Sequence, residues 1–234
     1  MTNYEKLEAQ HVIDTVERLH RRINDRFPDS GLSKVCLRLL MLAREAGERS
    51  HEIGRPIRAL RAATWIMVVF IVIAVIAMGV SLRMPEGTPD FLEFVQIFEA
   101  GINDVVLIGA GIFFLASFER RLKRNRALRH IGALRAIAHI VDMHQLTKDP
   151  SRVSSDWHQS DASPVNRFTP FLLTRYLDYC SELLSLTGKI AALYVQYFDD
   201  EVVTSAVNEV EQLTTGLSRK IWQKIMIMRN QKEG

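Results

Sequence analysis

The chain has 234 residues, of which 24% are charged and 47% are hydrophobic, and its formal net charge is only +3. This small positive charge does not indicate a nucleic-acid partner. The mean hydropathy of +0.01 averages strongly apolar and strongly charged segments, a composition that excludes a transporter with many spans. The sequence therefore predicts a small membrane anchor that carries helical segments outside the bilayer.

Residues 1–60 predict an N-terminal helical hairpin. Thr2 to Glu5 have the pattern of a capping box, which opens a helix, and Pro28 to Gly31 indicate a turn. The second helix leads toward the membrane and is expected to bend at Gly54-Arg55-Pro56, because an interior proline removes a backbone hydrogen bond. Met1–Arg26 carries charges throughout and lacks the apolar core of a signal peptide.

Residues 61–118 predict a transmembrane hairpin with an external loop at about 84–102. Its first apolar run, Ala62–Leu82, has 21 residues, enough to cross a hydrocarbon core of about 30 Å. The second run, Val105–Phe118, has only 14 and is roughly 10 Å too short. The second span must therefore include residues that precede Val105, among them Asn103 and Asp104. An acidic residue within a span is a candidate functional site.

The flanking charges predict the orientation of this hairpin. The segment between the two apolar runs contains one basic residue, Arg83, and five acidic ones: Glu86, Asp90, Glu93, Glu99 and Asp104. Basic residues cluster before the first span and after the second, at Arg49, Arg55, Arg58, Arg61, Arg120, Arg121, Lys123, Arg124, Arg126 and Arg129. Because basic residues favour the cytoplasmic side, both chain ends are expected in the cytoplasm.

The C-terminal arm is also expected to be helical. The second span continues as a cytoplasmic extension over 119–146, a polar loop follows at 147–168, and residues 169–234 form a helical hairpin. Thr169 and Pro170 have the pattern that starts a helix, expected to reach Phe198, and Asp199-Asp200 precede the last helix. That helix has a nearly heptad apolar seam, formed by Val203, Val207, Val210, Leu213, Leu217, Ile221, Ile225 and Met228. The fold class is all-α, with the N- and C-terminal arms forming one cytoplasmic helical bundle.

A polar stripe on the second membrane helix supplies candidates for the lining of a pore. Glu93, Gln96, Glu99 and Asn103 recur in steps of three or four, Ala110 and Ser117 follow at seven-residue steps on the same helix face, and Asp104 lies beside it. In a homo-oligomer this face could line a pathway whose acidic mouth favours cations. The alternative is that the acidic residues only cap an external helix at the interface. The candidates are Glu93, Gln96, Glu99, Asn103, Asp104 and Ser117.

Self-association is expected from two features. Small residues on both spans allow helices to approach closely, as in Ala77-x-x-x-Ser81, although the same residues could serve packing within one hairpin. The heptad seam of the last helix is the second feature and is expected to join subunits. Cys36 and Cys180 lie on apolar helix faces and are expected to be buried and reduced.

A polar cluster follows the membrane segment and is a possible catalytic or metal site. His139 and Asp142 are three residues apart and could both bind a metal, with His144 close by. The pair Arg135 and His139 resembles the Arg–His signature of HEPN ribonucleases, with one residue fewer between them. The alternative is that these are structural polar residues of a helical bundle, which their low specificity favours. No catalytic residue, metal or other cofactor is therefore expected.

The organisation of Arg49–Leu146 resembles that of the SLATT-type bacterial membrane effectors. These proteins have a two-span hairpin with both ends inside and a helical cytoplasmic region. The resemblance implies an oligomeric, pore-forming role in a bacterial inner membrane, with the lipid bilayer and other copies of the chain as partners.

Three functions are consistent with these observations. The preferred one is a homo-oligomeric regulated pore, or an effector that perturbs the membrane, with a cytoplasmic sensing bundle. The second is a membrane-anchored scaffold that recruits a cytoplasmic protein through its C-terminal helices. The third is a membrane-bound hydrolase or nuclease that uses the His139 cluster; the sequence favours a protein that is not an enzyme.

Overall fold

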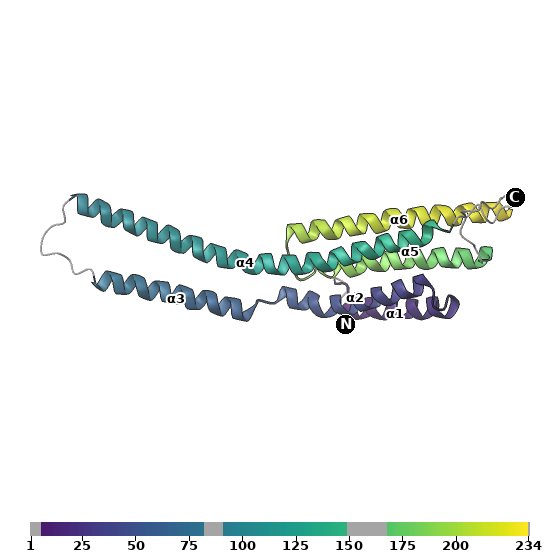
Figure 1. The fold of residues 1–234 in the computed structure, drawn as a ribbon, viewed down its shortest axis with the longest axis horizontal. Coiled ribbons are helices and arrows are strands. Elements are labelled where there is room, and N and C mark those ends of the chain that lie inside the picture. Colours follow the sequence, from purple (N-terminus) through teal and green to yellow (C-terminus); the bar gives the residue numbers. More distant parts are fainter. Residues whose placement is uncertain (1–5, 82–90, 149–167, 234) are drawn as a thin grey trace. The chain divides into compact units, whose positions relative to one another are not determined.

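The computed structural model describes residues 6–81, 91–148 and 168–233. The described residues contain helices and no strand, which confirms the all-α class. Figure 1 shows the helices, which in chain order are α1 (Ala9–Arg26), α2 (Gly31–Gly54), α3 (Arg58–Ser81), α4 (Phe91–Leu146), α5 (Pro170–Ala192) and α6 (Glu201–Glu233). They divide into two compact units: a helical unit, which takes in the chain up to Gly54 and from Arg126 on, and a helix pair, Arg55–Asn125.

The N-terminal arm begins its first helix later than expected. Lys6 to Glu8 are not helical, and α1 starts at Ala9; the capping box at 2–5 lies outside the described residues. The predicted turn joins α1 to α2, with Asp29 in the left-handed region at φ 54°. The hydroxyl of Ser30 then accepts a hydrogen bond from the backbone N–H of Ser33 (3.1 Å), which caps the start of α2.

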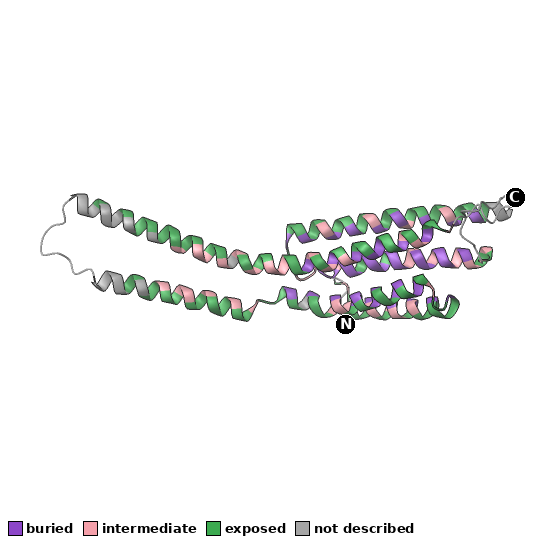
Figure 2. Cartoon of the chain, in the orientation of Figure 1, coloured by how far each residue is buried: buried purple, intermediate pink, exposed green. Residues whose placement is uncertain are grey.

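One hydrophobic core holds the helical unit together. It is formed by the inner faces of α1, α2, α5 and α6 and by the part of α4 that follows Arg126, as the burial pattern in Figure 2 shows. The largest fully buried side chains include Leu19, Leu39, Leu134, Leu183 and Tyr194. The core thus combines the N-terminal arm with the C-terminal arm.

The heptad seam of α6 is part of this core. Seven of its residues are buried, Val203, Val207, Val210, Leu217, Ile221, Ile225 and Met228, and Leu213 packs against them from a partly buried position. We expected this seam to join subunits. In the structure it faces the helices of its own chain, α5 above all, because a 3.5-residue repeat serves packing within one chain as well as between chains.

The helix ends follow local chemistry, with one difference from the expected bounds. Thr169 caps α5 by accepting the N–H of Leu172 (3.3 Å), with Pro170 in the first turn, and Asp200 caps α6 through the N–H groups of Val202 and Val203. However, α5 ends at Ala192 rather than Phe198. After Ala192 the backbone hydrogen bonds run to the carbonyl three residues earlier, as from the N–H of Tyr194 to the carbonyl of Ala191 (3.1 Å). Such a 3₁₀-type turn is a common helix ending.

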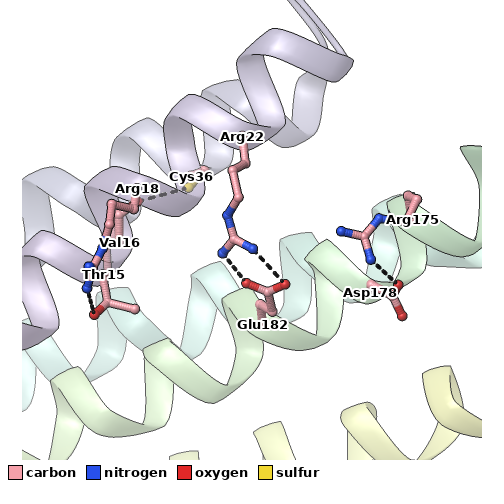
Figure 3. A network of polar contacts seen from close by, with 8 residues as sticks. All are labelled: Thr15, Val16, Arg18, Arg22, Cys36, Arg175, Asp178 and Glu182. Carbon is pink, nitrogen blue, oxygen red and sulfur yellow. Dashed lines mark hydrogen bonds and ion pairs between the residues drawn. The ribbon is translucent and has the colours of Figure 1, made fainter.

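Polar contacts reinforce the packing of α1 against α5 (Figure 3). The guanidinium of Arg22 forms a two-fold contact with the carboxylate of Glu182, at 2.5 and 3.5 Å, the geometry in which such pairs are strongest. Nearby, the buried Cys36 thiol lies 3.9 Å from the carbonyl oxygen of Val16. Cys36 and Cys180 are both buried thiols, as expected. Their burial raises the pKa of each to about 12, so that both remain protonated at neutral pH.

The structure confirms the break before the first predicted span, and it begins the second long helix inside the predicted external loop. α2 ends at Gly54 and α3 begins at Arg58, because Pro56 cannot continue the hydrogen-bond ladder. Residues 91–102 lie within the predicted external loop, where the amphipathic pattern from Phe91 on indicates an interfacial start to the second helix; they are helical and belong to α4. The rest of that loop, 82–90, and the polar loop at 149–167 lie outside the described residues.

Candidate functional site

The helix pair presents an apolar surface that is left exposed by the described residues. Trp65 on α3 is 69% exposed and Phe113 on α4 is 74% exposed, and other large hydrophobic side chains of both helices are also exposed. Figure 2 shows exposed residues along both helices. Among the described residues, two helical stretches are long and apolar enough to cross a membrane, within Gly31–Ile73 and within Gly101–Leu146. Exposed apolar surface of this extent marks a binding or membrane site.

The two helices of the pair lie antiparallel. Met67 of α3 lies beside Gly111 of α4, and Ile57 and Arg61 near the start of α3 contact Glu119. The predicted polar stripe lies on α4, whose backbone is helical at all six candidate positions. Glu99 and Asn103 are exposed and Ser117 is half-buried; the side chains of Glu93, Gln96 and Asp104 lie outside the described residues.

A carboxylate that the sequence did not single out fastens α3 to α4. Glu119 accepts the backbone N–H of Ile57 (3.1 Å), pairs with Lys123 (2.9 Å) and lies 3.9 Å from Arg61. We call this group the Glu119 clasp. Ile57 directly precedes α3, so the carboxylate lies at the positive end of that helix, where a negative charge is stabilising.

The charge state of the clasp follows from these contacts. Burial by itself would raise the pKa of Glu119, but the hydrogen bonds from Lys123 and Ile57 and the nearby positive charges outweigh it, so that the pKa lies below its ordinary value. Glu119 is therefore ionised near neutral pH. The only sequence signal for the clasp is one acidic residue at the edge of a basic run.

The structure does not bring the His139 cluster together. His139 is exposed, Asp142 accepts a hydrogen bond from the Gln145 amide (2.6 Å), and the ring of His144 packs against Gly31. Arg135, the partner in the HEPN-like pair, instead lies 3.3 Å from Glu209 of α6. The described residues contain no group of three or more His, Cys, Asp or Glu side chains that could hold a metal.

A different histidine, His130, forms a polar network between α2, α4 and the end of α5. Arg49 lies 2.6 Å from its Nε2 atom, Glu45 pairs with Arg49 at 3.5 Å, and the imidazole ring stacks on Tyr194 at 5.8 Å between centroids. Because an arginine can only donate, His130 must accept through Nε2 and is neutral here. Burial, then the charge of Arg49, lowers the pKa of His130.

This network predicts loss of stability in weak acid. A second histidine, His144, behaves in the same way: burial lowers its pKa, and the positive charge of Lys148 lowers it further. Both histidines therefore bind fewer protons when folded than when unfolded, so their contribution to stability is complete above a pH of about 6.5 and falls as the pH drops through the folded-state pKa values. We expect a lower melting temperature at about pH 5.5 than at pH 7.5. His130→Phe, which keeps a ring on Tyr194, should reduce that difference.

Exposed His139 provides the control for this measurement, since His139→Gln should leave the pH dependence unchanged. A melting temperature that rises on acidification, or a His130→Phe variant with the full difference, would contradict the assignment of a neutral His130.

No family model, curated protein or solved structure matches this chain. The function is therefore inferred from the chain's own residues and their arrangement.

Proposed function

We propose that α3 and α4 form a two-span membrane hairpin with both chain ends in the cytoplasm, in a bacterial inner membrane. The uncovered apolar surface of the two helices is the observation that carries this proposal. About 20 helical residues cross a hydrocarbon core of about 30 Å, and α3 supplies that length between Arg61 and Ser81. The basic residues that flank the pair favour the cytoplasmic side.

We further propose that copies of the hairpin assemble into a regulated pore, or a membrane-perturbing effector, with α4 lining the pathway. α4 is helical from Phe91 on, so its short apolar run is extended by the residues that carry the polar stripe. Asp104 precedes Glu119 by 15 residues, about 22 Å along a helix, which puts it inside a hydrocarbon core that begins at Glu119. The SLATT-like organisation supports the same function, with the helical unit as the sensing or gating part.

The topology has a direct test. A cysteine placed at position 88, in a chain whose Cys36 and Cys180 are replaced by alanine, should react with a membrane-impermeant maleimide added to intact spheroplasts. A cysteine introduced at position 230 should react only after permeabilisation, because the basic flanks hold that side in the cytoplasm. Labelling of position 88 only after permeabilisation would overturn the orientation.

A membrane-anchored scaffold is the second candidate, favoured by exposed apolar side chains on α6. Trp222, Met226 and Ile227 point out of the core although the heptad seam itself is buried. Large exposed aromatic and methionine side chains are frequent at protein interfaces. A scaffold needs no polar pathway, so that its activity should survive replacement of Asp104.

A further inference from the structure

Arginines from two chain segments lie at one end of the helix pair. Residues 55–61 contain three basic and no acidic residues, and residues 119–125 contain four basic residues and one acidic one. We call the exposed arginines of these two segments the basic collar: Arg55, Arg58, Arg61, Arg120 and Arg121. The contacts of Ile57 and Arg61 with Glu119 hold the two segments at the same level of the pair.

The only acidic residue in these two segments does not neutralise the whole collar. Glu119 is occupied by Lys123, whose side chain is 12% exposed, and by the N–H of Ile57. Arg58, Arg120 and Arg121 form no ion pair with any described residue. Their guanidinium groups are exposed, each able to donate two parallel hydrogen bonds to one phosphate.

The collar directly adjoins the apolar surface. Trp65 follows Arg61 by four residues and is 69% exposed, so the two side chains lie on one face of α3, about one turn apart. An aromatic ring beside a cation is the arrangement found at the membrane interface. A phospholipid offers the matching chemistry, a phosphate for the arginines and acyl chains for the apolar surface. The bases of a nucleic acid can stack on an aromatic ring but do not cover an aliphatic surface of this extent.

We propose that the basic collar selects anionic phospholipids from the membrane layer that contacts it. This inference rests on the proposed membrane hairpin. Basic residues near an anionic membrane surface are attracted to it electrostatically, and neutral zwitterionic headgroups do not provide that attraction. Anionic lipid should therefore be enriched around this end of α3 and α4.

Quenching of Trp65 fluorescence tests the proposal in the full chain. Trp157→Phe and Trp222→Phe leave Trp65 as the only tryptophan. This protein is reconstituted into vesicles of phosphatidylcholine and phosphatidylglycerol, with bromine on the acyl chains of one lipid or of the other. We expect brominated phosphatidylglycerol to quench more strongly at equal mole fraction, with a relative affinity on the order of ten-fold.

Three variants test whether the lipid preference depends on the collar or only on the net charge of the protein. Arg58→Gln, Arg120→Gln and Arg121→Gln together should bring the preference close to one, while lysine at the same three positions should retain most of it. The matched control is Arg38→Gln, Arg219→Gln and Lys220→Gln, exposed positions of the helical unit, which should keep the wild-type preference. Quenching by brominated phosphatidylcholine verifies that each variant is inserted, and in the collar variant it should increase as phosphatidylglycerol loses its preference.

Two results would overturn the proposal: equal quenching by the two lipids in the wild type, or a collar variant with the wild-type preference. Absence of quenching by either lipid is a distinct failure, because it would show that Trp65 is not in a bilayer and would overturn the membrane hairpin itself.

Discussion

Leu217→Asp should unfold the helical unit. Leu217 is 5% exposed in the seam that α6 buries in the core, so the new carboxylate would lose its hydration without gaining a partner. Burying an unpaired charge costs about 3–5 kcal/mol, a large part of the stability of an ordinary domain. Urea unfolding followed by circular dichroism should show a free energy of unfolding lowered by that amount, or no cooperative transition.

The control for this substitution lies on the same helix. Gln212 is exposed, so Gln212→Asp should change the free energy of unfolding by less than about 0.5 kcal/mol. Because the seam faces its own chain, the loss in Leu217→Asp should be the same at two protein concentrations ten-fold apart. A variant that stays folded but dissociates would show instead that the seam joins subunits.

Substitutions of Asp104 should change ion flux if α4 lines a pathway. Asp104→Asn removes one negative charge per subunit while keeping the shape of the side chain, so assembly should persist and the cation-over-anion preference should fall several-fold. Asp104→Leu also removes the polar group and should nearly abolish conductance. Both effects are measurable as reversal potential and conductance of the reconstituted protein.

Val105→Ala is the matched control, because neighbouring residues point about 100° apart around a helix and Val105 carries no charge. Its conductance and selectivity should equal those of the wild type. Flux that is indifferent to both Asp104 substitutions would remove α4 from the pathway. Wild-type protein that never conducts, or that is only monomeric by mass measurement in several detergents, would favour the scaffold.

The sequence predicted those features that depend on neighbouring residues. The all-helical class, the Thr169 cap, the Asp200 cap and the break at Pro56 all follow from interactions within a few positions, and the structure confirms them. The start of α1 and the end of α5 differ, because helix ends yield easily to packing. Tyr194, for example, leaves the helix and is buried in the core.

The polar contacts that matter most could not be predicted from spacing. Glu119 and Ile57 are 62 positions apart, and Arg49 and His130 are 81 apart. A local pattern carries no information on such pairs. The His139 cluster shows the converse: its members are close along the chain, yet they contact different partners, Gln145 for Asp142 and Gly31 for His144.

The shared core also dictates an order of events during synthesis. Arg22 of α1 meets Glu182 of α5, 160 positions later, and the core is closed only when α6 as far as Met228 has been made. During translation the inner face of the N-terminal hairpin therefore stays uncovered until α3 and α4, and then α5 and α6, have been synthesised. Chains with uncovered apolar faces aggregate readily, so a ribosome that stalls before α5 should yield a product that requires a chaperone or is degraded.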